Sequence, residues 1–383
     1  MEYSDHRPTQ AIVDLTAIRH NVERIKEQLE PTQEIYATVK ADGYGHGAIP
    51  VAHAALKAGA TGLAVATVDE GIELRSQGFS QVPILILGLT DPRGIAEILH
   101  YNLTITVSGL DFFQLAYEQL EETDQLNLLK LTPLKFHLAL DTGMGRIGLR
   151  TIDEIEAFKA GLVDFWWAFW EGVFTHMATA GGGPEEYIES QYQKWESLLT
   201  AIPDTVEYRH LANSAMGSWY NQYPTDIVRL GISMYGIDPK DDATLPVSRD
   251  LQPALQLISE IIYVKKIEQG SKVSYGATYE AKEDEWVATV PIGYADGWLR
   301  HYQPISLIVN GQRCPILGRI NMDQLMIKLP EYYEVGTTVT LIGTDYQETN
   351  HVSDIAKTVG TIGYEVLTSI GPRVPRVYLD ESK

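Results

Sequence analysis

One lysine stands where a buried strand opens into a glycine-rich turn. Residues 35–39 are mainly apolar, Lys40 follows them directly, and the turn at residues 41–47 contains three glycines and Tyr44. Burial disfavours the charged form of an amine and lowers its pKa. A neutral lysine amine can attack a carbonyl and form a Schiff base. The segment therefore predicts a nucleophilic lysine, or, as is commoner for lysines, a solvated residue at a strand end.

Polar residues also end other β-like runs. In a (β/α)8 barrel the carboxyl ends of the parallel strands meet on one face, and active sites lie there. Each residue taken alone is also explained as a cap or turn residue, and Ser214 in particular as a helix N-cap. Their convergence depends on the barrel prediction. These strand-end residues are Ser108, Asp141, His176, Ser214 and Arg229.

Residues 141–148 contain the G-x-G-x-x-G spacing of dinucleotide sites. The match follows the fifth β-like run and does not lie in an N-terminal βαβ unit. We therefore favour a glycine-permitted turn that presents Arg146.

A candidate phosphate site lies between residues 210 and 232, near the last two barrel strands. Loops after those strands frequently bind phosphate in this fold. The Ser214 hydroxyl and the backbone N–H groups of Gly231 and Ile232 are the candidate donors. Metal-ligand spacing is lacking, so structural or supporting roles are expected for His46, His176 and His210.

The order of elements predicts an α/β protein with a TIM-like (β/α)8 barrel, followed by a mainly β domain. Eight β-like runs alternate with amphipathic segments such as 48–58 and 153–159, and a doubly wound sheet is the alternative. The runs cover residues 35–40, 62–67, 83–88, 103–108, 134–141, 171–176, 206–213 and 226–231.

Short strands with little helical period dominate from about residue 257. Asn310-Gly311 predicts a type I′ hairpin within residues 305–317, and residues 337–343 and 373–379 add strands. We place the barrel at residues 12–243 and the β domain at 244–383, with residues 1–11 able to join it. The strand at residues 11–15 can join either domain.

The composition argues against nucleic acid and membrane partners. The chain has 383 residues and a net charge of −21, which repels both, although a few arginines can still form a local anion site. A single cysteine, Cys314, excludes intramolecular disulfides and fits a reducing cytoplasm. Residues 1–8 lack a signal-peptide pattern, and no apolar run reaches the length of a membrane span.

Together these segments resemble alanine racemases, enzymes that use pyridoxal 5′-phosphate (PLP). The motifs occur in the family's order along the whole chain, which is more specific than any one of them. The family's architecture, a barrel followed by a β domain, agrees with the order of elements above. The motifs lie at residues 39–47, 141–148, 175–176, 212–214, 229–236, 273–277, 291–297, 318–319, 322–324 and 364–366.

The resemblance implies a cofactor site at the strand ends. Lys40 is expected to hold PLP as a Schiff base. Arg229 is expected to face the pyridine nitrogen. Because arginine keeps its proton, that nitrogen should stay unprotonated, which weakens the cofactor as an electron sink and disfavours transamination. Arg146 would contact the phenolic oxygen and position the substrate carboxylate, and His176 would support Arg229 and the catalytic tyrosine. The residues expected to hold the phosphate are Tyr44, Ser214, Gly231, Ile232 and Tyr364, and Asn213 is expected as a further cofactor-binding residue.

The resemblance also implies a reaction, the interconversion of L- and D-alanine by two bases, which supplies D-alanine for peptidoglycan. Lys40 would serve one face of the substrate, and Tyr275 from the other subunit the opposite face, so a homodimer is expected. Met322 would offer its backbone N–H to the substrate carboxylate. The substrate entrance is expected at Tyr294, Arg300 and Arg319.

Three positions depart from the family pattern. Ala139 stands where many members carry a carbamylated lysine that braces the residue equivalent to Arg146. We hypothesise that a chloride, an ordered water or a nearby side chain takes that place. Asn321 and Gly181 replace a common cysteine and a common acidic residue, so a serine or broad-specificity racemase is an alternative. A non-catalytic PLP-binding barrel protein is a second alternative, which the β domain and the Tyr275 motif disfavour.

Overall fold

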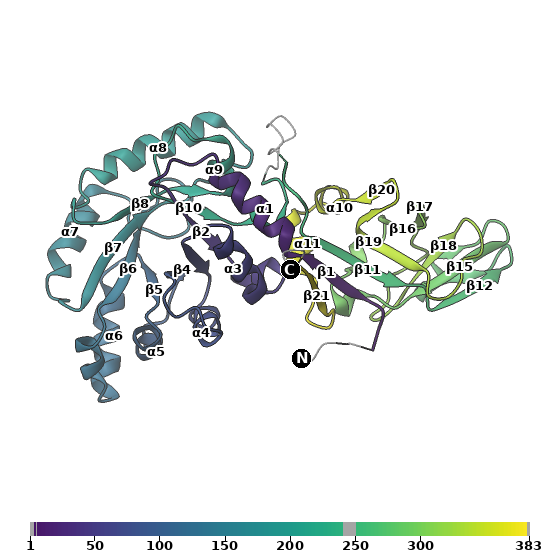
Figure 1. Cartoon of the computed structure of the whole chain (residues 1–383), viewed down its shortest axis with the longest axis horizontal. Coiled ribbons are helices and arrows are strands. Elements are labelled where there is room, and N and C mark those ends of the chain that lie inside the picture. The colour runs from purple at the N-terminus through teal and green to yellow at the C-terminus, as the bar shows by residue number, and fades with distance from the viewer. Residues whose placement is uncertain (1–3, 5, 240–249, 381–383) are drawn as a thin grey trace.

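Two lobes make up the structure, a parallel barrel and a mainly β domain (Figure 1). The computed structural model describes residues 4, 6–239 and 250–380. The predicted domain boundary at residues 243 and 244 lies outside them.

Nine parallel strands of the described residues form the barrel, in the order β8-β7-β6-β5-β4-β3-β2-β10-β9. Only Leu211 separates β8 (Tyr208–His210) from β9 (Ala212–Asn213), so these two ends of the sheet form one interrupted strand and the sheet closes. All eight predicted runs are thus barrel strands, and the doubly wound alternative is wrong. The other strands are β2 (Glu34–Thr38), β3 (Gly62–Val65), β4 (Ile84–Leu89), β5 (Thr104–Val107), β6 (Leu134–Ala139), β7 (Ala168–Phe174) and β10 (Ile227–Leu230).

Helices connect the barrel strands and cover the outside of the barrel (Figure 1). Two of them begin with a capping box, in which a threonine and a glutamate three residues later satisfy each other's backbone N–H groups. No helix in the described part of the chain is both long and apolar enough to cross a membrane. The helices are α1 (Leu15–Lys26), α3 (Ala48–Lys57), α4 (Val68–Ser76), α5 (Ile95–His100), α6 (Asp111–Glu122), α7 (Ile152–Leu162), α8 (Glu185–Leu199) and α9 (Ser214–Trp219). The short segment α2 (Lys40–Tyr44) follows β2 and is a left-handed turn.

The second lobe is built mainly from antiparallel strands and includes the N-terminal strand β1 (Gln10–Asp14), whose pairing with β21 (Arg376–Leu379) is the parallel exception. This strand also pairs with β11 (Leu255–Glu260), so it joins the β domain. The predicted hairpin is confirmed, because Asn310 and Gly311 have φ of 48° and 71° between β16 and β17. The remaining strands are β12 (Tyr263–Ile267), β13 (Lys272–Val273), β14 (Tyr279–Glu280), β15 (Glu285–Val290), β16 (Ser306–Val309), β17 (Gln312–Pro315), β18 (Leu325–Leu329), β19 (Thr338–Asp345) and β20 (Glu348–Asn350).

The expectation of little helix after residue 257 is wrong near the C-terminus. Helices α10 (Val352–Val359) and α11 (Gly363–Thr368) interrupt the strands. Val352, Ile355 and Ala356 are buried at helical spacing, but so short a segment gives a weak periodic signal. Helix α11 packs against α2 and brings Tyr364 to the barrel.

Gly236 lies at the end of the barrel chain, with φ of 79°. A Cβ there would stand 1.9 Å from the carbonyl oxygen of Gln252. That backbone cannot retreat freely, because Asn21 donates to the Gln252 oxygen at 2.8 Å and accepts from its N–H at 2.8 Å.

We therefore expect Gly236→Ala to lower the free energy of unfolding by roughly 3 kcal/mol or more, through strain and steric overlap. Gly360→Ala is the matched control, because Gly360 has φ of 78° and a Cβ there would meet no atom of the described residues within 4 Å. It should lose only about 1–2 kcal/mol, the cost of a left-handed alanine. Denaturant unfolding of both variants measures the difference, and equal losses would contradict the steric argument.

Candidate active site

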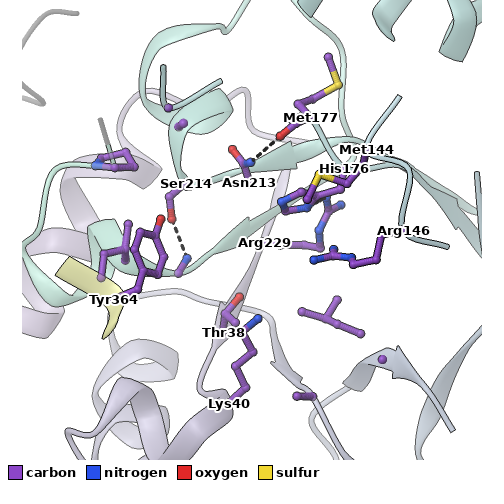
Figure 2. A pocket seen from close by; sticks show the side chains of 18 of the residues that line it. Thr38, Lys40, Met144, Arg146, His176, Met177, Asn213, Ser214, Arg229 and Tyr364 are labelled. Atoms are coloured by element: carbon purple, nitrogen blue, oxygen red, sulfur yellow. Dashed lines mark hydrogen bonds between the residues drawn. The ribbon is translucent and has the colours of Figure 1, made fainter. Parts of the chain in front are cut away.

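A cavity of about 810 Å³ lies at the carboxyl ends of the barrel strands (Figure 2). Lys40, Arg146 and Arg229 line it, and no aspartate or glutamate of the described residues does so. This local excess of positive charge contrasts with the net charge of −21 on the whole chain. Such a site favours an anionic ligand.

Lys40 begins a left-handed turn. The strand β2 ends at Thr38, so Lys40 does not end the strand as predicted. Residues 41–44 have φ between 51° and 60°, which costs about 1–2 kcal/mol for each non-glycine residue. Two carboxylates hold the turn: Glu70 accepts from the Ala41 N–H at 2.7 Å, and Asp42 accepts from the Ala48 N–H at 2.8 Å.

The amine of Lys40 points into the cavity, as does the guanidinium of Arg146 (Figure 2). Burial lowers the pKa of Lys40, repulsion by Arg146 lowers it further, and Glu70 partly offsets both. The direction agrees with the sequence-based expectation. It increases the fraction of neutral amine, the form that acts as a nucleophile or base.

Arg229 is buried on β10 and hydrogen-bonded on several sides. Its Nη1 donates to Nδ1 of His210 at 2.6 Å, and its Nη2 donates to the Thr175 carbonyl at 2.8 Å. His176 lies beside it, with Nδ1 3.5 Å from Nη2. Burial, with repulsion by Arg146, lowers the pKa of Arg229 to about 9, so the guanidinium stays charged at neutral pH. Burial, with repulsion by Arg229, lowers the pKa of His176 to about 3, so its ring is neutral.

The predicted phosphate residues all line the cavity, and Figure 2 shows Ser214 and Tyr364 on the same side of it. Ser214 accepts from the Gly231 N–H at 2.8 Å, and the rings of Tyr44 and Tyr364 lie 5.9 Å apart. A Cβ on Gly231 would stand 2.7 Å from the Tyr44 hydroxyl, so the missing side chain keeps this cradle open. The N-cap of α9 is Asn213, which accepts from the Met216 N–H at 3.1 Å, and not Ser214.

Five predicted residues do not line the cavity of this chain. All are exposed on the β domain, with Tyr275 at 72%. They therefore lie outside the cluster that the barrel brings together. They are Tyr275, Tyr294, Arg300, Arg319 and Met322.

Most of these exposed residues belong to loops that are bonded to one another. The Tyr294 N–H donates to the Asn321 carbonyl at 3.1 Å. The hydroxyl of Ser274, which precedes Tyr275, donates to the Arg319 carbonyl at 2.6 Å and lies 3.3 Å from Asn321 Oδ1. The β domain thus presents Tyr275 and its neighbours as one surface.

Two of the residues that depart from the family pattern, Ala139 and Gly181, lie in different surroundings. Ala139 is buried on β6, and no hydrogen bond or ion pair within the described residues holds the Arg146 guanidinium. Gly181 lines the cavity, and a Cβ there would stand 2.4 Å from the Pro239 carbonyl oxygen. The present backbone therefore excludes a side chain at residue 181.

Sequence reasoning missed the polar residues inside the barrel. His137 and Glu171 are buried beneath Arg229 and connect to it through His210. One pattern in the sequence could have indicated them. Lys135 and His137 lie two residues apart, on the same face of a strand whose other residues are apolar. Glu70 was missed as well, because its contact with the Lys40 turn joins segments far apart in the sequence.

The chain matches two protein-family models. They are "Alanine racemase, N-terminal domain" over residues 13–239 and "Alanine racemase, C-terminal domain" over residues 254–378. An alanine racemase from Ligilactobacillus salivarius is 44% identical over 378 residues, which cover 97% of this chain and 98% of that protein. The structure of an alanine racemase from E. faecalis has a TM-score of 0.93 at 42% identity and covers 99% of this chain and 100% of its own. A histidine racemase from Leuconostoc mesenteroides subsp. sake has a TM-score of 0.90 at 32% identity, with 99% and 100% coverage.

His46 lies fully buried behind the Lys40 turn. Its Nδ1 lies 3.0 Å from the Tyr44 carbonyl and therefore donates, and its Nε2 has no partner within the described residues. Burial lowers the pKa of His46 from 6.5 to about 4. Between pH 6.5 and pH 4, His46 binds a proton in the unfolded chain but not in the folded chain. The free energy of unfolding is therefore highest above pH 6.5 and decreases as the pH falls towards 4.

We expect His46 to contribute a fall of about 1.4 kcal/mol per pH unit to the free energy of unfolding over this window. His46→Phe keeps the ring that packs 4.5 Å from Tyr235 and should make the pH slope shallower by that amount. Denaturant unfolding at several pH values between 7 and 4 measures both slopes. Parallel slopes for wild type and variant would show that His46 is not held neutral.

Proposed function

The chain belongs to the alanine racemase family of isomerases, as its motifs indicated, and we propose that it interconverts L- and D-alanine with PLP held in the barrel cavity. The observation that carries this proposal is the cavity's three cationic side chains and lack of acidic ones among the described residues. PLP supplies a phosphate and alanine a carboxylate, and both match that charge. The product D-alanine would serve peptidoglycan synthesis, and the buried, single Cys314 fits action in the cytoplasm.

The residues present fit PLP. Lys40 would form the covalent attachment, and Arg229 would face the pyridine nitrogen. When bound, the cofactor stabilises negative charge on the substrate α-carbon. Its phosphate would be held by the side chains or N–H groups of Tyr44, Ser214, Gly231, Ile232 and Tyr364, with Asn213 capping the adjoining helix.

Racemisation requires a proton to leave one face of the substrate and another to arrive on the opposite face. Lys40, whose pKa burial lowers, would act on one face, and Tyr275 of the partner subunit on the other. Arg146 and the Met322 N–H would orient the substrate carboxylate. Arg229 keeps its proton and so disfavours transamination, while neutral His176 supports it from the side.

The exposed surface of Tyr275 supports a homodimer in which each β domain completes the partner's cavity. Tyr275 is 72% exposed and does not line the cavity of its own chain. Tyr294, Arg300 and Arg319 would line the entrance formed in this way. Symmetric exchange of one residue makes the two sites equivalent.

A chloride ion near Arg146 and Ala139 would replace the carbamylated lysine of many relatives. Ala139 offers only a methyl group, and the Arg146 guanidinium has no partner in the described part of the chain. An anion would screen the repulsion between Arg146 and the amine of Lys40.

A broader or different substrate range is the second candidate function. The histidine racemase among the structural neighbours has the same fold at 32% identity. Asn321, bonded to the Tyr275 loop, and Gly181, which lines the cavity, both depart from the common residues. Assay of a panel of D- and L-amino acids, including serine and histidine, separates the two candidates.

Mixing two inactive variants tests the shared site. Lys40→Ala and Tyr275→Phe should each lose at least about 10²–10⁴-fold in activity, because each lacks one base. A mixed dimer has one site with both residues intact, so random pairing should restore about one quarter of wild-type activity. A racemisation assay after subunit exchange measures the recovery, and no recovery would contradict a site shared between subunits.

The same variants separate attachment from catalysis. After borohydride treatment, mass spectrometry should find PLP bound to residue 40 in wild type and Tyr275→Phe but not in Lys40→Ala. Wild-type protein that acquires no such label would overturn the cofactor assignment. Full activity in Tyr275→Phe would favour a role other than two-base racemisation.

Halide removal tests the anion. Activity should fall several-fold in halide-free buffer and return as chloride is added, while bicarbonate alone has no effect because Ala139 cannot be carbamylated. Activity that is independent of chloride, together with no anomalous signal beside Arg146 in bromide-soaked crystals, would exclude the halide.

A further inference from the structure

A continuous chain of polar side chains crosses the interior of the barrel below the cavity. We define this core chain as Arg229, His210, His137, Glu171 and Lys135. Arg229 Nη1 lies 2.6 Å from His210 Nδ1, and His210 Nε2 lies 2.8 Å from His137 Nδ1. His137 Nε2 lies 3.4 Å from Glu171 Oε2, and Glu171 Oε1 lies 2.5 Å from Lys135 Nζ.

The core chain runs from the cavity to the amino ends of the strands. Both histidine side chains are fully buried, and Arg229 and Glu171 are 4% and 6% exposed. Lys135, the second residue of β6, ends the chain with a side chain that is 41% exposed. Thr104, the first residue of β5, also donates to Glu171 Oε2 at 3.2 Å.

The two ends of the core chain fix every proton between them. A guanidinium only donates, so His210 Nδ1 must accept and its proton must sit on Nε2. That N–H then donates to His137 Nδ1, which leaves the His137 proton on Nε2. There it meets the Glu171 carboxylate, which only accepts. One arrangement alone satisfies all three contacts, with both histidines neutral and protonated on Nε2.

The electrostatics agree with this arrangement. Burial lowers the pKa of both His137 and His210, which keeps their rings neutral. Burial raises the pKa of Glu171, but hydrogen bonds from His137 and Lys135 outweigh it and bring the pKa to about 2. No carboxylate of the described residues forms an ion pair with Arg229, so the polarised chain is its connection to a buried negative charge.

We propose that Glu171 and His137 are positioning residues for the racemase reaction, which act by fixing the tautomer of His210 and thereby the orientation of Arg229 towards the cavity. Their catalytic effect rests on the proposed function, whereas the proton positions do not. The alternative is a buried polar cluster that only stabilises the barrel.

Neutron diffraction from deuterated crystals of the PLP-loaded protein tests the proton positions without any variant. Deuterium is expected on Nε2 of His137 and of His210 and absent from Nδ1 of both. Deuterium on Nδ1 of either ring would overturn the proposal. This result stands whether or not alanine proves to be the substrate.

Glu171→Gln tests the coupling to Arg229. The amide of the glutamine can donate to His137 and so reverse the direction of donation along the core chain. An N–H of His210 would then face the Arg229 guanidinium. We expect kcat to fall about tenfold with little change in KM, as for loss of an orienting partner. In an Arg229→Lys background the same substitution should cost less than about twofold. Equal losses in both backgrounds would overturn the proposal.

Thr106→Val is the matched control for disturbance of the barrel interior. Thr106 is 1% exposed on β5, beside His137 in the sheet register, and its hydroxyl donates to the Ile86 carbonyl at 2.7 Å, outside the core chain. It should lower the midpoint of thermal unfolding as Glu171→Gln does, but leave kcat near wild type. A kcat loss equal to that of Glu171→Gln would mean that the barrel interior, and not the core chain, sets the rate.

Discussion

A guanidinium buried at the mouth of a closed barrel must find all its hydrogen bonds inside the protein. Arg229 imposes this constraint, and the surrounding backbone meets it. The sheet is interrupted at Leu211, and the carbonyl freed there accepts from Arg229 Nη2 at 3.3 Å. The Thr175 carbonyl beyond the end of β7 accepts at 2.8 Å. The irregular strand ends that close the barrel are therefore also the groups that hold its central cation.

The turn that carries Lys40 is strained, because its residues adopt a left-handed conformation. Contacts from both lobes stabilise this turn. The run of left-handed residues persists because contacts from elsewhere fix it. Tyr235 donates to the Thr38 carbonyl at 2.9 Å from the barrel side. From the β domain, Arg376 donates to the Gly45 carbonyl at 2.9 Å. The β domain thus supports the lysine of its own chain while it presents Tyr275 on its surface.

The positive charge of the cavity connects these features. Burial lowers the pKa values of Lys40 and Arg229, and repulsion by Arg146 lowers both further. An anionic ligand would offset this concentration of positive charge. The core chain adds a buried negative charge below the cavity without placing a carboxylate in it. Substrate and cofactor anions can then bind the cations directly.

The sequence by itself determined the order of strands and helices in the barrel, the hairpin at Asn310-Gly311 and the residues near the carboxyl ends of the barrel strands. These features depend on local periodicity and turn chemistry, which nearby residues encode. Only the tertiary structure decided that β8 and β9 close the sheet and that α11 packs against α2 and so brings Tyr364 to the cavity. It also decided that His137, His210 and Glu171 form one directed chain. Such contacts join segments far apart along the chain, and their geometry is set by sheet closure and packing, which no local pattern contains.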